Sequence, residues 1–86
     1  MFDYTNKVVA ITGASSGIGL EIARQFYLAG ASLALCSRSA VRVRDAITDW
    51  CAADDSRVLV MSADTSKVED IYAFRDAAVE KFVIKS

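Results

Sequence analysis

The sequence predicts an α/β fold built on a three-stranded parallel sheet with three helices. Three short apolar runs, at residues 8–11, 32–36 and 58–61, have the length and composition of buried strands. Amphipathic stretches with apolar residues at helical spacing follow each run. A sheet with one face in water would alternate apolar and polar residues, so continuous apolar runs indicate parallel strands covered by helices on both faces.

The chain has 86 residues, which is enough for one small domain, and it contains no proline and no linker-like segment. Right-handed crossovers between successive parallel strands give the spatial order 3-2-1. The first two helices should lie on one face of the sheet. The third should lie on the opposite face, where it would cross toward the far side of the first strand. This arrangement is half of a doubly wound nucleotide-binding sheet.

The composition is that of an ordinary globular protein, with 53% hydrophobic residues, 24% charged residues and a net charge of -1. No basic face favours nucleic acid as a partner. The first seven residues carry an acid where a signal peptide has positive charge, and no apolar run is long enough to span a membrane. We therefore expect a cytoplasmic protein with neither nucleic-acid nor membrane partners.

Two cysteines and no histidine are present, so we expect no metal site and no disulfide framework. Both thiols are expected to be small apolar groups, with Cys36 on a buried strand and Cys51 on the inner face of the second helix.

The predicted helices have start and stop signals. Gly30 should end the first helix in a left-handed conformation, and Ser39 should cap the second. Ser66 and Glu69 have the spacing of a capping box at the start of the third helix. The expected inward residues are Ile18, Ile22, Ala23 and Phe26 in the first helix, Val43, Ile47, Trp50 and Cys51 in the second, and Val68, Ile71, Tyr72, Val79 and Phe82 in the third.

A glycine-rich turn connects the first strand to the first helix. Such a turn leaves the first N–H groups of the helix unpaired and directed toward the end of the strand, which favours an anion. Glycine permits positive φ and removes the Cβ that would keep a phosphate away from the backbone. The alternative is a structural turn without a ligand. The residues concerned are Gly13, Gly17 and Gly19, with hydroxyl groups from Ser15 and Ser16.

The segment Thr-Gly-Ala-Ser-Ser-Gly-Ile-Gly at residues 12–19 resembles the cofactor loop of the short-chain dehydrogenases/reductases. The resemblance extends from Lys7 to about Phe82, which is the cofactor-binding half of that family. It implies a partial Rossmann fold over residues 1–86 and an oxidoreductase that transfers hydride between NADP(H) and a carbonyl or alcohol substrate. The loop residues implied in cofactor binding are Gly13, Ser15, Ser16, Gly17, Ile18 and Gly19.

The end of the second strand bears on cofactor choice. In NAD-binding sheets a carboxylate about twenty residues beyond the glycine loop binds the adenosine ribose. This chain has Ser37, Arg38 and Ser39 at that place, so no acid repels a 2′-phosphate and Arg38 offers a fork of donors for one. The two serines supply further donors. NADP is therefore favoured over NAD, the alternative being that Arg38 is a solvated surface charge.

The end of the third strand carries Asp64 and Thr65. The family resemblance implies that Asp64 binds the adenine amino group and that Thr65 closes that end of the pocket. The alternative is an Asp64 that serves the following turn and the first N–H groups of the helix.

The catalytic residues of the resembled family, a serine and a Tyr-x-x-x-Lys pair, do not occur in the 86 residues, so no catalytic residue is assigned. Whether this chain turns over a substrate is left open. After Phe82 the chain departs from the family pattern, which suggests a truncated domain whose first strand is an exposed edge. Such an edge favours self-association or pairing with a full-length relative. The alternative functions are a non-catalytic nucleotide-binding or interaction module, or a non-productive fragment.

Overall fold

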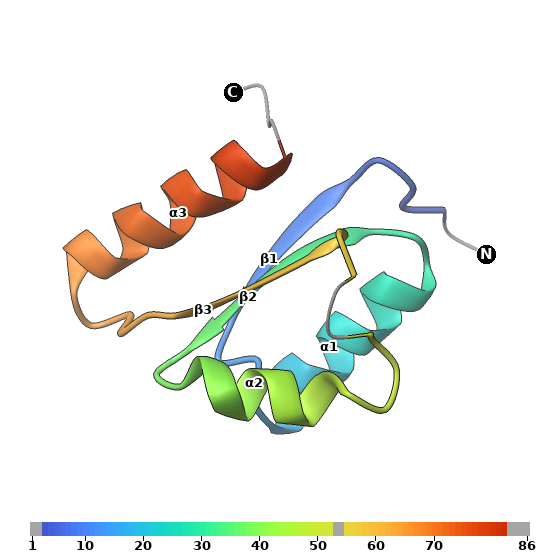
Figure 1. Ribbon diagram of the computed structural model, residues 1–86, viewed down its shortest axis with the longest axis horizontal. Coiled ribbons are helices and arrows are strands. Elements are labelled where there is room, and N and C mark those ends of the chain that lie inside the picture. The colour runs from blue at the N-terminus through green and yellow to red at the C-terminus, as the bar shows by residue number, and fades with distance from the viewer. Residues whose placement is uncertain (1–2, 53–54, 83–86) are drawn as a thin grey trace.

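The computed structural model describes residues 3–52 and 55–82. Strands and helices alternate along the chain as the sequence predicts (Figure 1). The elements are β1 (Val8–Thr12), α1 (Gly17–Leu28), β2 (Ser32–Ser37), α2 (Ala40–Ile47), β3 (Val58–Ser62) and α3 (Val68–Phe82).

The three strands form a parallel sheet in the spatial order β1-β2-β3, which confirms the predicted topology. In register, Ala10 of β1 lies beside Ala34 of β2, and Leu35 of β2 lies beside Val60 of β3. Because the strands run in the same direction, the loops that follow all three meet at one edge of the sheet. We call this the carboxyl edge.

The sheet separates two apolar cores. Leu33 and Leu35 of β2 pack with Val43 of α2 and other buried residues on one face, whereas Ala34 and Cys36 pack with α3 residues on the other. These four β2 side chains are fully buried, as a central strand requires. Figure 1 shows α1 and α2 together on one side of the sheet and α3 on the opposite side, as predicted.

Helix α1 differs from the prediction in the residues that it buries. Ala23 is fully buried and Phe26 packs against the core, but Ile18 is 80% exposed and Ile22 is 41% exposed. The first turn of α1 begins beyond the carboxyl end of β1, so Ile18 has no sheet beneath it. Gly30 ends the helix as predicted, with φ of 99° and its N–H donated to the carbonyl of Tyr27 at 3.0 Å.

Helix α2 is shorter than predicted, because it ends at Ile47. Trp50 and Cys51 lie in the turn that follows, where the N–H of Cys51 donates to the carbonyl of Ile47 at 2.9 Å. Cys51 is buried nonetheless, and the ring of Trp50 packs against that of Tyr27 with centroids 5.1 Å apart. The apolar character of these positions was predicted correctly, but their helical conformation was not.

Helix α3 begins without the predicted capping box. The hydroxyl of Ser66 donates to Asp64 Oδ1 at 2.7 Å, and the helix starts at Val68. Phe74 and Ala78 are buried, and Phe82 packs beside them. The predicted inward residues Val68, Ile71, Tyr72 and Val79 are exposed instead. A lone helix on this face meets the sheet only through a narrow stripe.

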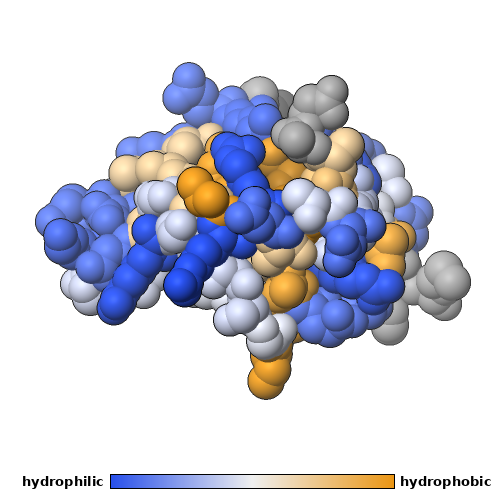
Figure 2. Space-filling view, turned by 60° about the horizontal axis from the view of Figure 1, so that its bottom comes forward, coloured by the Kyte–Doolittle hydropathy of each residue, from blue (hydrophilic) through white to orange (hydrophobic). Residues whose placement is uncertain are grey.

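Exposed apolar residues are spread over the surface. Figure 2 views the side on which α1 and α2 lie, and it shows apolar patches separated by hydrophilic side chains. Among the described residues, none of the helices is both long enough and apolar enough to cross a membrane.

Candidate functional site

A pocket of about 450 Å³ opens at the carboxyl edge of the sheet. The loops after β1, β2 and β3 all contribute to it, and this edge is where open parallel sheets bind their ligands. Its lining residues are Gly13, Ser15, Ser37, Arg38, Ser39, Arg42, Ala63 and Thr65.

The loop after β1 needs glycine at each of its three glycine positions. Gly13 and Gly17 have φ of 65° and 63°, a conformation that side-chain-bearing residues rarely adopt. A Cβ on Gly19 would lie 2.6 Å from the carbonyl oxygen of Gly13, so α1 could not approach the loop this closely with any other residue. The N–H of Ala14 donates to the carbonyl of Cys36 at 3.2 Å, which ties the loop to β2.

The start of α1 has no side-chain cap. Ser16 occupies the N-cap position in an extended conformation, but its hydroxyl makes no capping hydrogen bond. The first-turn N–H groups of α1 therefore have no serine oxygen as acceptor and keep their positive field. Of the predicted loop residues, Gly13 and Ser15 line the pocket; Ser16, Gly17, Ile18 and Gly19 do not.

The loop after β2 uses its serines to hold its own shape. The Ser37 hydroxyl donates to the carbonyl of Ser39 at 2.9 Å and accepts the N–H of Ser39 at 3.1 Å. The Ser39 hydroxyl oxygen accepts the N–H of Arg42 at 3.3 Å and so caps α2 as predicted. The proton of Ser37 is therefore donated within the loop in this structure, and its donation to a cofactor phosphate stays a prediction.

Two arginines line the pocket, whereas the sequence predicted only Arg38. Arg42 is an exposed residue of the first turn of α2. Its position three residues after the cap Ser39 was the available signal, because helical side chains lean back toward the N-terminus of their helix. No carboxylate lines the pocket, and within residues 3–52 and 55–82 neither guanidinium forms an ion pair.

Asp64 organises the turn after β3 and does not itself line the pocket. Its Oδ1 accepts the N–H of Ser66 at 2.9 Å and the hydroxyl of Ser66 at 2.7 Å. These bonds lower the pKa of Asp64, and the charges of Arg38 and Lys67 lower it further. The predicted structural alternative for Asp64 is thus present, while its contact with adenine stays a prediction. Thr65 does line the pocket.

The sequence matches the short chain dehydrogenase family over residues 7–84. The WW domain-containing oxidoreductase of Homo sapiens is 36% identical over 85 residues, which cover 94% of this chain and 20% of that protein. The 11-beta-hydroxysteroid dehydrogenase B of Sesamum indicum is 40% identical over 77 residues, covering 90% and 21%. The chain thus spans about a fifth of the length of these curated relatives.

Solved structures share the fold. A glucose/ribitol dehydrogenase of Brucella melitensis superposes with a TM-score of 0.86 at 28% identity, over 94% of this chain and 34% of that one. A 3-ketoacyl-(acyl-carrier-protein) reductase of the same organism, solved with NADH, gives 0.78 at 32% identity, over 91% and 31%. The C-domain of a bacterial malonyl-CoA reductase, solved with NADP, gives 0.73 at 30% identity, over 92% and 13%. With its glycine loop, sheet order and family match, this chain belongs to the short-chain dehydrogenase/reductase family of oxidoreductases and has that family's nucleotide-binding fold.

Proposed function

We propose that residues 1–86 form the NADP(H)-binding unit of an oxidoreductase that transfers hydride between NADP(H) and a carbonyl or alcohol substrate. The observation that carries this proposal is the pocket at the carboxyl edge. It is lined by part of the glycine loop and by two arginines that have no carboxylate partner in the part of the chain that the structure describes. An anionic ligand is the natural complement of such a pocket.

Different residues of the chain would bind different parts of the dinucleotide. The glycine loop and the uncapped start of α1 would hold the diphosphate, because backbone N–H groups and the helix field both favour a negative group there. Arg38 would bind the 2′-phosphate through charge-assisted hydrogen bonds. Thr65, which lines the pocket, and the Asp64 carboxylate in the adjoining turn would contact the adenine. The bound nicotinamide would donate hydride to a carbonyl carbon in its reduced form, or accept hydride from an alcohol carbon in its oxidised form.

Cofactor fluorescence tests the proposal directly. Titration of the 86-residue chain with NADPH and NADH should show binding of both, with NADPH binding more tightly. The Gly19→Ala variant should weaken both, because its Cβ would displace the Gly13 carbonyl and reshape the loop. Ala73→Ser on the exposed side of α3 serves as the control. If the wild-type chain is folded and binds neither dinucleotide, the proposal is wrong.

Turnover separates an enzyme from a binding module. A panel of aldehydes and ketones is added to the NADPH-loaded chain, and loss of NADPH absorbance is followed. Binding without turnover favours a non-catalytic module, and neither binding nor turnover favours a non-productive fragment.

A second proposal concerns β1, which would pair with another chain. Among the described residues β1 pairs with β2 alone, and Ala10 at its centre is exposed. Unpaired strand edges recruit other strands, so the chain should self-associate or bind a longer relative through β1. Light scattering should show a concentration-dependent increase in mass that Ala10→Lys reduces. A wild-type chain that stays monomeric throughout would contradict the proposal.

A further inference from the structure

The open edge of β1 and one flank of α1 lie on the same side of the molecule and form a single interaction surface. We propose that this surface binds a second copy of the chain, with the two β1 strands antiparallel about a two-fold axis at Ala10. In this dimer, Lys7 of each copy lies beside the glycine loop of the other copy and helps to bind the diphosphate there. The inference rests on the proposed function, because it concerns the same loop.

The backbone of β1 is arranged for such a pairing. The carbonyl of Lys7 accepts the N–H of Ser32 at 2.8 Å, so it points toward β2. Because backbone groups alternate in direction along a strand, those of Val8, Ala10 and Thr12 point toward the open edge. Antiparallel pairing about Ala10 would join Ala10 to Ala10 and Val8 to Thr12, which gives all of these groups a partner.

The side chains of β1 also permit two copies to meet. Val9 and Ile11 pack against the core on the α1 face, and the pairing puts Val9 of one copy opposite Ile11 of the other. No residue of β1 is charged, so no like charges meet across the axis. A two-fold contact uses the same patch on both copies and therefore closes at a dimer.

The flank of α1 that faces past β1 extends this surface. Tyr27 faces α2, because its ring packs against that of Trp50. Ile18 and Ile22 lie about 180° and 140° around the helix from Tyr27, and both are exposed. Because α1 contacts both β1 and β2, the α1 helices of the two copies would lie about 10 Å apart, which is an ordinary helix-packing distance. Each Ile22 would thereby be covered by the α1 of the other copy.

Lys7 cannot reach the glycine loop of its own copy. It is exposed and forms no ion pair within residues 3–52 and 55–82. Gly13, which lines the pocket, is six positions further along the chain, or about 20 Å along an extended strand. In the dimer, the antiparallel register brings Lys7 of the second copy beside Gly13, with about 5 Å between the Cα atoms. Alternation along β1 puts Lys7 on the face of Val9 and Ile11, which is the face that α1 covers.

A diphosphate would couple ligand binding to dimer formation. Without a ligand, Lys7 of the second copy meets the positive field at the uncapped start of α1, which weakens the dimer. A diphosphate on the glycine loop would lie between these positive groups and attract both. The dinucleotide should therefore tighten the dimer, and by reciprocity the dimer should tighten dinucleotide binding.

Sedimentation equilibrium of the 86-residue chain measures the dimer dissociation constant with and without NADPH. NADPH should lower this constant by about tenfold. Lys7→Gln should abolish the shift, whereas Lys81→Gln, which removes the same charge from the exposed end of α3, should keep it. Ile22→Asn should weaken the dimer with or without NADPH. Leu28→Asn, at an exposed position on another side of α1, should not.

A mixing experiment tests whether Lys7 acts on the other copy. Lys7→Gln keeps an intact glycine loop and Gly19→Ala keeps Lys7, so each variant alone should bind NADPH weakly. An equimolar mixture should recover tight binding in the mixed dimers, where Lys7 of the Gly19→Ala copy lies beside the intact loop. A mixture that binds NADPH only as the sum of its two components would overturn the inference.

The other outcomes also have defined meanings. If the chain binds NADPH but its dimer dissociation constant does not respond, or if Lys7→Gln keeps the response, the inference is wrong while the proposed NADP(H)-binding function stands. A mass that grows beyond a dimer overturns the two-fold pairing, and so does a chain that stays monomeric with NADPH, whose β1 would then pair with a longer relative. If the folded wild type binds no dinucleotide, the proposed function fails, and the role of Lys7 fails with it.

Discussion

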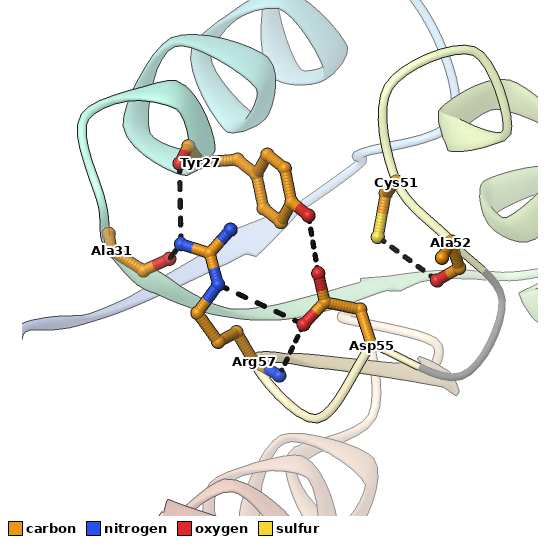
Figure 3. A network of polar contacts seen from close by, with 6 residues as sticks. All are labelled: Tyr27, Ala31, Cys51, Ala52, Asp55 and Arg57. Carbon is orange, nitrogen blue, oxygen red and sulfur yellow. Dashed lines mark hydrogen bonds and ion pairs between the residues drawn. The ribbon is translucent and has the colours of Figure 1, made fainter.

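Arginine side chains lie at both ends of the sheet, but their surroundings differ. At the carboxyl edge Arg38 and Arg42 line an open pocket, and none of the carboxylates in residues 3–52 and 55–82 lines it. At the amino ends of β2 and β3, the half-buried Arg57 takes part in a network of contacts with Tyr27, Ala31 and Asp55 (Figure 3).

The network around Arg57 joins three parts of the chain. Nη1 of Arg57 donates to the carbonyls of Tyr27 and Ala31, at 3.5 and 3.3 Å, and its guanidinium carbon lies 4.1 Å from the centroid of the Tyr27 ring. Asp55 Oδ1 accepts the N–H of Arg57 at 2.8 Å, and the Tyr27 hydroxyl donates to Asp55 Oδ2. The end of α1 is thereby fastened to the start of β3.

The arginines at the two ends of the sheet are expected to contribute to different properties: folding stability at the amino ends, and ligand binding at the carboxyl edge. A charge whose partners lie inside the fold contributes to the free energy of folding, whereas a charge left without partners is available to a ligand. Substitutions at the two ends should therefore move different measurements.

The largest effect on stability is expected for Arg57→Met. It removes two hydrogen bonds to carbonyls, the contact with the Tyr27 ring and the ion pair with Asp55. We expect the free energy of unfolding to fall by about 2 kcal/mol in urea titrations. The control is Arg75→Met, whose ion pair with Asp76 is exposed and should be worth less than about 0.5 kcal/mol. Equal effects would show that the network does not stabilise the fold.

Tyr27→Phe should have the next largest effect. It keeps the ring beneath Arg57 but leaves Asp55 without the hydroxyl that donates to it. A loss of about 1 kcal/mol in unfolding free energy is expected. Tyr72→Phe, at an exposed position on α3, should leave stability unchanged. A Tyr27→Phe variant as stable as wild type would argue against the hydroxyl bond.

A smaller effect is expected from pH. The hydrogen bond from Tyr27 lowers the pKa of Asp55 in the folded chain. The stability that Asp55 contributes is therefore fully present above the unfolded pKa of about 3.9, and it is lost as pH falls through the lower folded pKa. The same bond raises the pKa of Tyr27 in the folded chain. The stability that Tyr27 contributes is therefore fully present below about pH 10, and it is lost as pH rises through the higher folded pKa. Tyr27→Phe should flatten both limbs of a stability-pH curve.

The smallest effect on stability is expected at the carboxyl edge. Arg38→Ala and Arg42→Ala should each change the unfolding free energy by less than about 0.5 kcal/mol, since both side chains are exposed and lack ion pairs within the described residues. Thermal unfolding of the ligand-free variants measures this. A large loss of stability in either variant would contradict the difference that we expect between the carboxyl edge and the amino ends of the strands.

The sequence was sufficient for the features that depend on local chemistry. Continuous apolar runs located β1, β2 and β3, and the crossover rule gave their order. The need for glycine at residues 13, 17 and 19 was also predicted from the turn alone, and the backbone shows a reason at each position. These features depend on residues that lie close together in the sequence.

Helix faces and helix ends were less predictable. The apolar spacing of α3 fits a stripe through Val68, Tyr72 and Val79 as well as one through Phe74 and Ala78, and only the latter pair is buried. The width and position of the sheet decide which stripe is covered. Likewise, α2 ends at Ile47 although the apolar spacing continues to Cys51.

By itself, the sequence determined the class of fold, the order of its strands and the turn that could receive a diphosphate, because these follow from residues a few positions apart. Only the tertiary structure could place Arg42 beside Arg38 in one pocket and Asp55 against Tyr27, which is 28 residues away. Such contacts depend on how the helices pack on the sheet, and this packing involves segments that are distant in sequence.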